Sequence, residues 1–272
     1  MSLLAQMATS SALRVKFARA ARSEVALLAA CEAAPPPPPL RLGRFELIAE
    51  IKRCSPAEGR LEVATDVGVR AQTYAAAGAA VVSVLTEPER FAGSLDDLGV
   101  AASALQSHGV PAMRKDFLVD PWQVLEARAA GAGGVLLILA MLSDDAVAEM
   151  LAAAREQGLF VLLEAFDEAD LERCSRWLAD HSGAPLLLGV NCRDLRTLAV
   201  DPGRLARLAP RLPQGVPAVA ESGIRDAAGA AEAARLGYCL ALVGTALMRA
   251  PEPRVLAAAM LAAGRRVAQE DR

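Results

Sequence analysis

Histidine is nearly absent from this sequence, which contains only His108 and His181 among its 272 residues. The two histidines lie far apart in the chain and in polar surroundings. A zinc site or a Ser-His-Asp triad would be hard to build from them, because both depend on closely placed imidazoles. We therefore expect no metal at the functional site.

Paired cysteines and long apolar runs are also missing. The five cysteines are scattered without a Cys-x-x-Cys motif, which argues against a zinc ribbon and a disulfide framework and predicts a reducing, cytoplasmic location. No stretch reaches the roughly 18 apolar residues of a membrane span, and the N-terminus does not read as a secretory signal. The net charge of −3 does not give the chain the overall basic character that is typical of nucleic-acid-binding proteins. We expect neither a membrane nor a nucleic acid as partner.

Lysine is rare as well. Only Lys16, Lys52 and Lys115 among the 29 basic residues are lysines, and the rest are arginines. A lysine can lose its proton and carries its charge at one compact point, whereas the guanidinium group of arginine keeps its proton and spreads its charge over a plane. We attribute Lys16, in a helical N-terminal segment, to chance. Lys52 and Lys115 are candidates for positions where arginine would not serve.

A repeated strand-then-helix pattern fills most of the chain. Eight short and nearly continuous apolar runs, typical of strands buried on both faces, are each followed by a helical pattern. The runs are residues 47–52, 81–86, 111–115, 135–139, 160–164, 186–191, 218–221 and 241–244. Eight such units predict a single (β/α)8 barrel of the α/β class. An open doubly wound sheet is the alternative, but no GxGxxG motif follows the first strand.

Residues 1–44 lie outside this repeat, and we expect them to form an N-terminal helical extension to the barrel. A helical pattern covers about residues 11–31, and prolines occupy positions 35–39. Such a proline run predicts a stiff polyproline II spacer. Residues 45–272 are then the barrel, the predicted catalytic domain.

Polar and charged residues gather at the predicted carboxyl ends of the strands, where barrels of this class carry their active sites. They include Glu50, Lys52, Ser83, Thr86, Arg114, Lys115, Glu164, Asn191, Arg193, Glu221 and Ser222. Any one of them could be a structural ion pair. So many charges ending apolar strands are best explained if they pair with one another and with a charged ligand, because a buried unpaired charge costs several kcal/mol.

The last two strand ends predict a phosphate site. Gly223 and Gly244 would let the backbone approach an anion closely, and a short helix starting near Thr245 would direct its N–H groups inward. The loops after strands seven and eight are the usual phosphate site of such barrels. Lys52 ends strand one, beside strand eight in a closed barrel, and can add a charge.

Six fragments, in order along the chain from Leu47 to Pro253, resemble indole-3-glycerol-phosphate synthase. They are Glu50-Ile51-Lys52-Arg53-Cys54-Ser55-Pro56, Ser83-Val84-Leu85-Thr86-Glu87, Arg114-Lys115-Asp116-Phe117, Gly189-Val190-Asn191-Cys192-Arg193-Asp194-Leu195, Ala220-Glu221-Ser222-Gly223-Ile224 and Val243-Gly244-Thr245-Ala246-Leu247-Met248. The resemblance implies a carboxy-lyase of tryptophan biosynthesis that needs no metal or organic cofactor. It closes 1-(2-carboxyphenylamino)-1-deoxyribulose 5-phosphate to indole-3-glycerol phosphate, releasing CO2 and water.

The resemblance also implies roles for individual residues. Lys115 matches the general acid and Glu164 its acid/base partner, and burial with neighbouring positive charge is expected to lower the pKa of the lysine. Lys52 matches a residue that holds anionic groups and can donate a proton in the dehydration. The remaining matches are the positioning residues Glu50 and Asn191, the ring walls Phe117 and Leu136, the binding residues Ser55, Arg193, Glu221 and Ser222, and the phosphate cradle Gly223, Gly244 and Thr245. Which lysine donates the proton in each step stays open.

Other functions fit the sequence less well. Phosphoribosylanthranilate isomerase would pair a Cys with an Asp, whereas strand one here ends Glu-x-Lys, and a metal-dependent epimerase would need histidine ligands. A retired or secondary-pathway paralogue that binds a related sugar phosphate is the alternative function, although the intact set of charged residues argues against a retired copy. Other enzymes of the tryptophan pathway are candidate partners. The N-terminal helix is expected to help cover the site, as in the family.

Overall fold

The computed structural model of the protein describes residues 2–56, 59–61, 66–180, 185–194 and 198–270. His181 and Leu195, named above, lie outside these residues. Within the described ranges, no helix is long and apolar enough to cross a bilayer.

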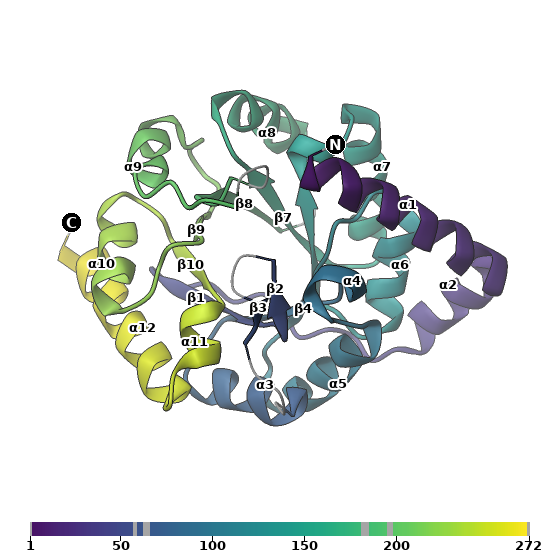
Figure 1. The fold of residues 1–272 in the computed structure, drawn as a ribbon, viewed down its shortest axis with the longest axis horizontal. Helices are drawn as coiled ribbons and strands as arrows, with labels where there is room; N and C mark the ends of the chain where they lie inside the picture. Colours follow the sequence, from purple (N-terminus) through teal and green to yellow (C-terminus); the bar gives the residue numbers. More distant parts are fainter. Residues whose placement is uncertain (1, 57–58, 62–65, 181–184, 195–197, 271–272) are drawn as a thin grey trace.

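Eight parallel strands close into a barrel in the order β1-β10-β9-β8-β7-β6-β5-β4, and β4 pairs back onto β1 (Figure 1). The strands are β1 (Glu46–Ile51), β4 (Val81–Leu85), β5 (Ala112–Lys115), β6 (Gly134–Ile138), β7 (Phe160–Ala165), β8 (Leu186–Asn191), β9 (Ala218–Glu221) and β10 (Leu240–Val243). All are buried along most or all of their length, as the continuous apolar runs predict. The predicted (β/α)8 barrel is confirmed, and the predicted strands differ from the observed ones only at their ends.

A ring of helices covers the outside of the barrel (Figure 1). They are α3 (Val67–Ala76), α5 (Leu95–Leu105), α6 (Pro121–Ala129), α7 (Asp144–Glu156), α8 (Glu168–Asp180), α9 (Arg204–Leu208), α10 (Ala227–Arg235) and α12 (Pro253–Glu270). Several begin at an oxygen-bearing cap: the side chains of Asp66, Ser143 and Asp226 accept hydrogen bonds from backbone N–H groups of the first turn. These caps satisfy donors that a helix start otherwise leaves unpaired.

Side chains alternate across each strand, and this alternation builds the site. The interior of the barrel is filled by an apolar layer that includes Ile48, Val81, Met113, Leu162 and Val219. Two positions further along the same strands, and therefore on the same inward face, the residues are polar: Glu50, Ser83, Lys115, Glu164 and Glu221. The apolar layer in the barrel interior is therefore followed, two residues further along each of these strands, by a polar layer. We call this polar layer the floor.

Two short elements were not foreseen from the sequence. The connection after β1 contains an antiparallel pair, β2 (Cys54–Ser55) and β3 (Gly59–Arg60). A one-turn helix, α4 (Pro88–Phe91), follows β4, and the side chain of Glu87 caps it by accepting three backbone hydrogen bonds. The predicted short helix near Thr245 is present as α11 (Thr245–Arg249).

The N-terminal extension forms two helices, α1 (Leu3–Ala21) and α2 (Glu24–Ala33), where the sequence suggested a single helical stretch. The chain is extended at Arg22 and Ser23, and the Ser23 hydroxyl starts α2 by accepting a hydrogen bond from Ala26 N–H. The two helices lie along the side of the barrel (Figure 1) and pack on α6, where Val15 and Leu27 contact Trp122. The polyproline II conformation of residues 35–39 stays a prediction.

Candidate active site

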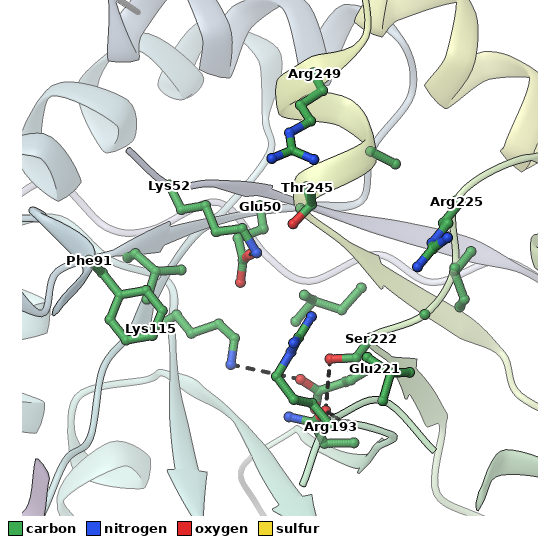
Figure 2. Close-up of a pocket in the computed structure, with 18 of the residues that line it drawn as sticks. Glu50, Lys52, Phe91, Lys115, Arg193, Glu221, Ser222, Arg225, Thr245 and Arg249 are labelled. Carbon is green, nitrogen blue, oxygen red and sulfur yellow. Dashed lines mark hydrogen bonds and ion pairs between the residues drawn. The ribbon is translucent and has the colours of Figure 1, made fainter. Parts of the chain in front are cut away.

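A cavity of about 940 Å³ opens at the carboxyl ends of the barrel strands (Figure 2). Every predicted site residue except Ser55 lines it. Ser55 is buried in β2, beyond the end of β1, where it is paired with Gly59 of β3. Among the described residues, no group of three or more His, Cys, Asp or Glu side chains is arranged to hold a metal ion.

Lys115 lies between two carboxylates at the centre of the floor. Its Nζ atom is 3.3 Å from Glu164 Oε2 and 3.8 Å from Glu221 Oε2. Burial acts to lower the pKa of Lys115, but the negative charges of Glu164, Glu221 and Glu50 outweigh it and raise the pKa above the usual lysine value. The expected lowering of this pKa is therefore wrong, because the charged neighbours of Lys115 are anions.

The two carboxylates beside Lys115 have unused hydrogen-bonding capacity. Neither oxygen of Glu221 and only one oxygen of Glu164 has a hydrogen-bond partner among the described residues, although both side chains are 1% exposed. Burial and the neighbouring charge of Glu164 raise the pKa of Glu221 well above its usual value. Buried polar atoms are normally paired, so these oxygens are available to water or to a ligand.

Glu50 and Lys52 form a second ion pair across the cavity, with Lys52 Nζ 2.8 Å from Glu50 Oε1. Gly244, on the neighbouring strand end, faces this pair. Its backbone φ is an ordinary −115°, so the chain conformation does not require glycine there. A Cβ atom at Gly244 would, however, collide with Glu50 Oε1 and come within 3.0 Å of Lys52 Nζ. The glycine therefore makes room for the ion pair as well as for close approach by a ligand.

Asn191 and Ser222 join the ends of β8 and β9. Asn191 Oδ1 accepts hydrogen bonds from the Arg193 backbone N–H (2.9 Å) and from Ser222 Oγ (2.8 Å). These bonds orient the amide so that its NH2 group is the part left for a ligand. Ser222 (φ 66°) and Gly223 (φ 80°) are both left-handed, a conformation rare for serine and common for glycine. Such strain in a loop beside a cavity is typical of functional sites.

An apolar wall faces the charged floor. It contains the predicted Phe117 and Leu136, together with Phe91 from the end of α4. The rings of Phe91 and Phe117 lie 6.1 Å apart between centroids, at 39°. Sequence reasoning missed Phe91 because it looked for polar residues at strand ends, and this side chain comes several residues after β4.

Two arginines at the mouth of the cavity were also missed. Arg225 follows Gly223 in the loop after β9, and Arg249 ends α11. Both are exposed, and Figure 2 shows both side chains directed toward the cavity from the side of Thr245 and Ser222. Their nearness in sequence to the two predicted phosphate-loop glycines was a signal that could have found them.

Arg114 and Asp116 flank Lys115 in the chain but face away from its carboxylates. Asp116 accepts two hydrogen bonds from Arg14 of α1 (2.9 and 2.8 Å), and others from Arg114 (3.1 Å) and Thr86 (2.8 Å). Burial acts to raise the pKa of Asp116, but Arg14 and Arg114 outweigh it and lower the pKa to about 2. This ionised network holds the end of β5, and with it Lys115, against α1.

Comparison with known proteins adds independent information. A family model described as indole-3-glycerol phosphate synthase matches residues 17–260 of this chain. The indole-3-glycerol phosphate synthase of Parafrankia sp. (strain EAN1pec) is 45% identical over 225 residues, which cover 83% of this chain and 81% of that protein. The one from Mycobacterium tuberculosis (strain CDC 1551 / Oshkosh) is 40% identical over 252 residues, covering 91% and 89%.

Solved structures share the barrel at much lower identity. The 3-hexulose-6-phosphate synthase of Salmonella typhimurium superposes with a TM-score of 0.61 at 14% identity, covering 82% of this chain and 100% of that one. Tryptophan synthase from M. tuberculosis gives a TM-score of 0.60 at 18% identity, with 88% and 97% covered. At these identities, the likeness shows the fold alone.

Proposed function

The chain belongs to the indole-3-glycerol phosphate synthase family, and from this membership we propose how the residues of its cavity carry out the reaction. The enzyme is a carboxy-lyase of tryptophan biosynthesis and acts on a phosphorylated small molecule. The observation that carries the assignment of roles is the position of Lys115 between Glu164 and Glu221, under an aromatic wall and beside a cationic mouth.

In the first step, Lys115 is the general acid of ring closure. The anthranilate ring carbon that bears the carboxylate attacks the ketone carbon of the substrate, and the ketone oxygen takes a proton from the Lys115 ammonium group. The raised pKa keeps Lys115 protonated at neutral pH, and the alkoxide that forms is basic enough to accept that proton. Loss of CO2 then returns its bonding electron pair to the ring and restores aromaticity.

In the second step, a hydroxyl leaves as water. An acid must protonate the leaving oxygen, and a base must take a proton from the intermediate. Glu164 is the base, because its Oε1 atom has no partner among the described residues and its Oε2 atom already contacts Lys115. Lys52 is the acid of this step, and Glu50, 2.8 Å away, holds it in place.

The apolar wall of the cavity and its mouth differ in chemistry, as do the anthranilate ring and the phosphate of the substrate. Phe117, Leu136 and Phe91 contact the anthranilate ring, since the wall that they form is apolar and aromatic. The phosphate binds at the mouth, between Gly223, Gly244, Thr245 and Lys52, with Arg225 and Arg249 nearby. Asn191, Arg193, Glu221 and Ser222 contact the sugar chain between them.

The direct test is formation of indole-3-glycerol phosphate from 1-(2-carboxyphenylamino)-1-deoxyribulose 5-phosphate, followed by indole fluorescence. We expect turnover by the purified protein and a loss of about 100-fold or more in Glu164→Gln, the scale of one general acid–base group. A Glu164→Gln turnover within a few-fold of wild type would remove Glu164 from the mechanism. Tight substrate binding without product would instead favour the alternative of a retired paralogue, for which the comparisons lend no support.

The cysteines bear on the location of the enzyme in the cell. All five cysteines are free thiols, which supports a reducing compartment, and we place the enzyme in the cytoplasm. Its product is the substrate of a later step in the same pathway, which makes other tryptophan-pathway enzymes its candidate partners.

We assign residues 1–44 to an extension of the barrel domain rather than to a separate domain, because α1 and α2 pack on α6.

A further inference from the structure

Gly189 occupies an unusual place in the middle of β8. Glycine weakens a strand interior because it has no side chain to pack and loses much conformational freedom on folding. Gly189 does not have a positive φ angle, so the backbone conformation does not require glycine. Something else near this position must therefore account for the missing side chain.

The space beside Gly189 is occupied by the carboxylate of Glu221. A Cβ atom built on Gly189 would collide with Glu221 Oε1 and lie 3.1 Å from its Cδ atom and 3.2 Å from Leu162 Cδ1. In the sheet register, Gly189 is paired with Glu164 of β7, and Asn191 is paired with Glu221 of β9. Gly189 therefore faces the barrel interior at the level of Glu164, and Glu221 extends into the slot that the glycine leaves.

Little else holds Glu221 where it is. Its contacts among the described residues are an ionic one with Lys115 at 3.8 Å and a carboxyl–carboxyl interaction with Glu164, and neither of its oxygens accepts a hydrogen bond from an N–H group there. The slot at Gly189 therefore sets the position of the carboxylate beside Lys115 together with these two contacts. A side chain at position 189 would move the far end of Glu221, which is flexible, and would leave the backbone in place.

We propose that Gly189 is a positioning residue for the reaction: its lack of a side chain sets the Glu221 carboxylate against Lys115 and Glu164. Gly189 touches no substrate itself and acts through Glu221. The proposal rests on the role given above to Lys115 as the general acid, and it adds to the sugar contact of Glu221 a second role, which is to hold the Lys115 ammonium group in place. Gly244 and Glu50 repeat the arrangement across the cavity, where a Cβ atom would also meet a carboxylate oxygen. Gly134 differs, because a Cβ atom there would strike the rigid ring of Phe160.

A double-mutant cycle tests the proposal, because it separates an effect through Glu221 from a general effect on the fold. The variants are Gly189→Ala, Glu221→Ala and the double variant, each measured for kcat, KM and thermal unfolding. Gly99→Ala is the matched control, since the nearest atom to its added Cβ is 3.8 Å away and α5 tolerates alanine. We expect Gly189→Ala to lower kcat by about 10-fold or more, with KM changed by less than about threefold, because small misplacements of catalytic groups are costly.

In the Glu221→Ala background, the same glycine substitution should lower kcat by less than about twofold, since the group that it displaces is gone. Equal losses in both backgrounds, or wild-type kcat in Gly189→Ala, would overturn the proposal. If Gly189→Ala does not fold, Glu221→Ala should restore folding by removing the collision, and failure to do so would also overturn it. Wild-type turnover in Glu221→Ala alone would overturn it through its premise, the role of Glu221, and would be seen without any change at Gly189.

Discussion

Lys115 and Arg114 are neighbours in the chain, yet strand alternation gives them different surroundings. Lys115 faces the cavity, where it contacts Glu164 and Glu221. Arg114 is 2% exposed on the other face, where it donates hydrogen bonds to the Thr86 hydroxyl, the Gln123 carbonyl and the carboxylates of Glu126 and Asp116. The two cations therefore differ in their contacts: Lys115 faces two carboxylates across the cavity floor, and Arg114 donates several directed hydrogen bonds on the other face.

We expect Lys115→Arg to fold and bind substrate but to lose about 100-fold or more in turnover, because guanidinium does not release its proton. Steady-state kinetics, with circular dichroism as the check on folding, measure this. If most of the activity remained, Lys115 would be an electrostatic residue and Lys52 the better candidate for the acid.

Arg114→Lys is the matched exchange, and the structure predicts a different phenotype. A lysine cannot replace the several directed hydrogen bonds of Arg114, so the free energy of unfolding should fall by about 2 kcal/mol while turnover stays within a few-fold. Urea unfolding and kinetics on the same preparation separate the two effects. A large loss of turnover without a loss of stability would contradict this assignment.

Asp116 provides a pH-dependent prediction. Its pKa is about 2 in the folded protein against 3.8 for an ordinary aspartate, so its ionised form stabilises the fold. This contribution is fully present above about pH 4 and is lost as the pH falls toward 2. Asp116→Asn should therefore cost about 3 kcal/mol at pH 7, since it leaves Arg14 and Arg114 poorly compensated, and progressively less below pH 4. Urea unfolding at several pH values tests this; a difference independent of pH would argue against it.

At the scale of elements, α1 and α2 are joined to the barrel by both apolar and ionic contacts. Val15, Leu27 and Cys31 form one small core with Trp122 and Leu125 of α6. Met7 belongs to the apolar cluster that also contains Phe117 of the ring wall. Arg14 holds Asp116 beside Lys115. The extension thus contacts the catalytic end of the barrel as well as its side.

Deletion of residues 1–34 should raise KM several-fold, because it removes support from Phe117 and from the end of β5. The melting temperature should also fall, since Trp122 and Leu125 become exposed to water. Turnover should change little, because no predicted catalytic residue lies in the deleted segment. Arg14→Gln, which keeps both helices, should show a smaller increase in KM. A truncated protein with wild-type KM would refute the covering role of the extension.

For the whole molecule, the distribution of charge matters more than its sum. The net charge is −3, and the cavity is lined by five basic residues and five acidic ones, with Arg225 and Arg249 at its mouth. We expect the two arginines at the mouth to raise the local concentration of an anionic substrate, and salt screens such an effect over about 10 Å at 0.1 M.

We therefore expect kcat/KM to fall as ionic strength rises. The double variant Arg225→Gln/Arg249→Gln should lower kcat/KM by about threefold or more at low salt and flatten its salt dependence. Arg211→Gln is the control, because Arg211 is similarly exposed but pairs with Glu168 away from the cavity. An unchanged salt profile in the double variant would mean that these arginines do not guide the substrate.

The sequence by itself determined the barrel and most of the residues that line its cavity. Nearly continuous apolar runs of strand length are typical of strands buried on both faces, and eight of them with helical patterns between indicated the closed barrel that the structure contains. Because all parallel strands then end at one rim, polar residues at strand ends must meet there. This is why Lys52, Lys115, Glu164 and Glu221, far apart in the chain, could be assigned to one cavity before their contacts were known.

The tertiary structure decided what depends on distances between separate strands and loops. The direction of the Lys115 pKa shift depends on which charges are nearest, and three carboxylates outweigh burial. Ser55 lies in β2 and does not line the cavity, whereas Phe91, Arg225 and Arg249 line it from the connections after β4, β9 and β10, whose paths no periodicity encodes. Gly189 leaves a slot in β8, and only the packing of the strands shows that Glu221 of β9 occupies it. Local patterns determine which face of a strand a residue occupies; only packing determines which residue it meets there.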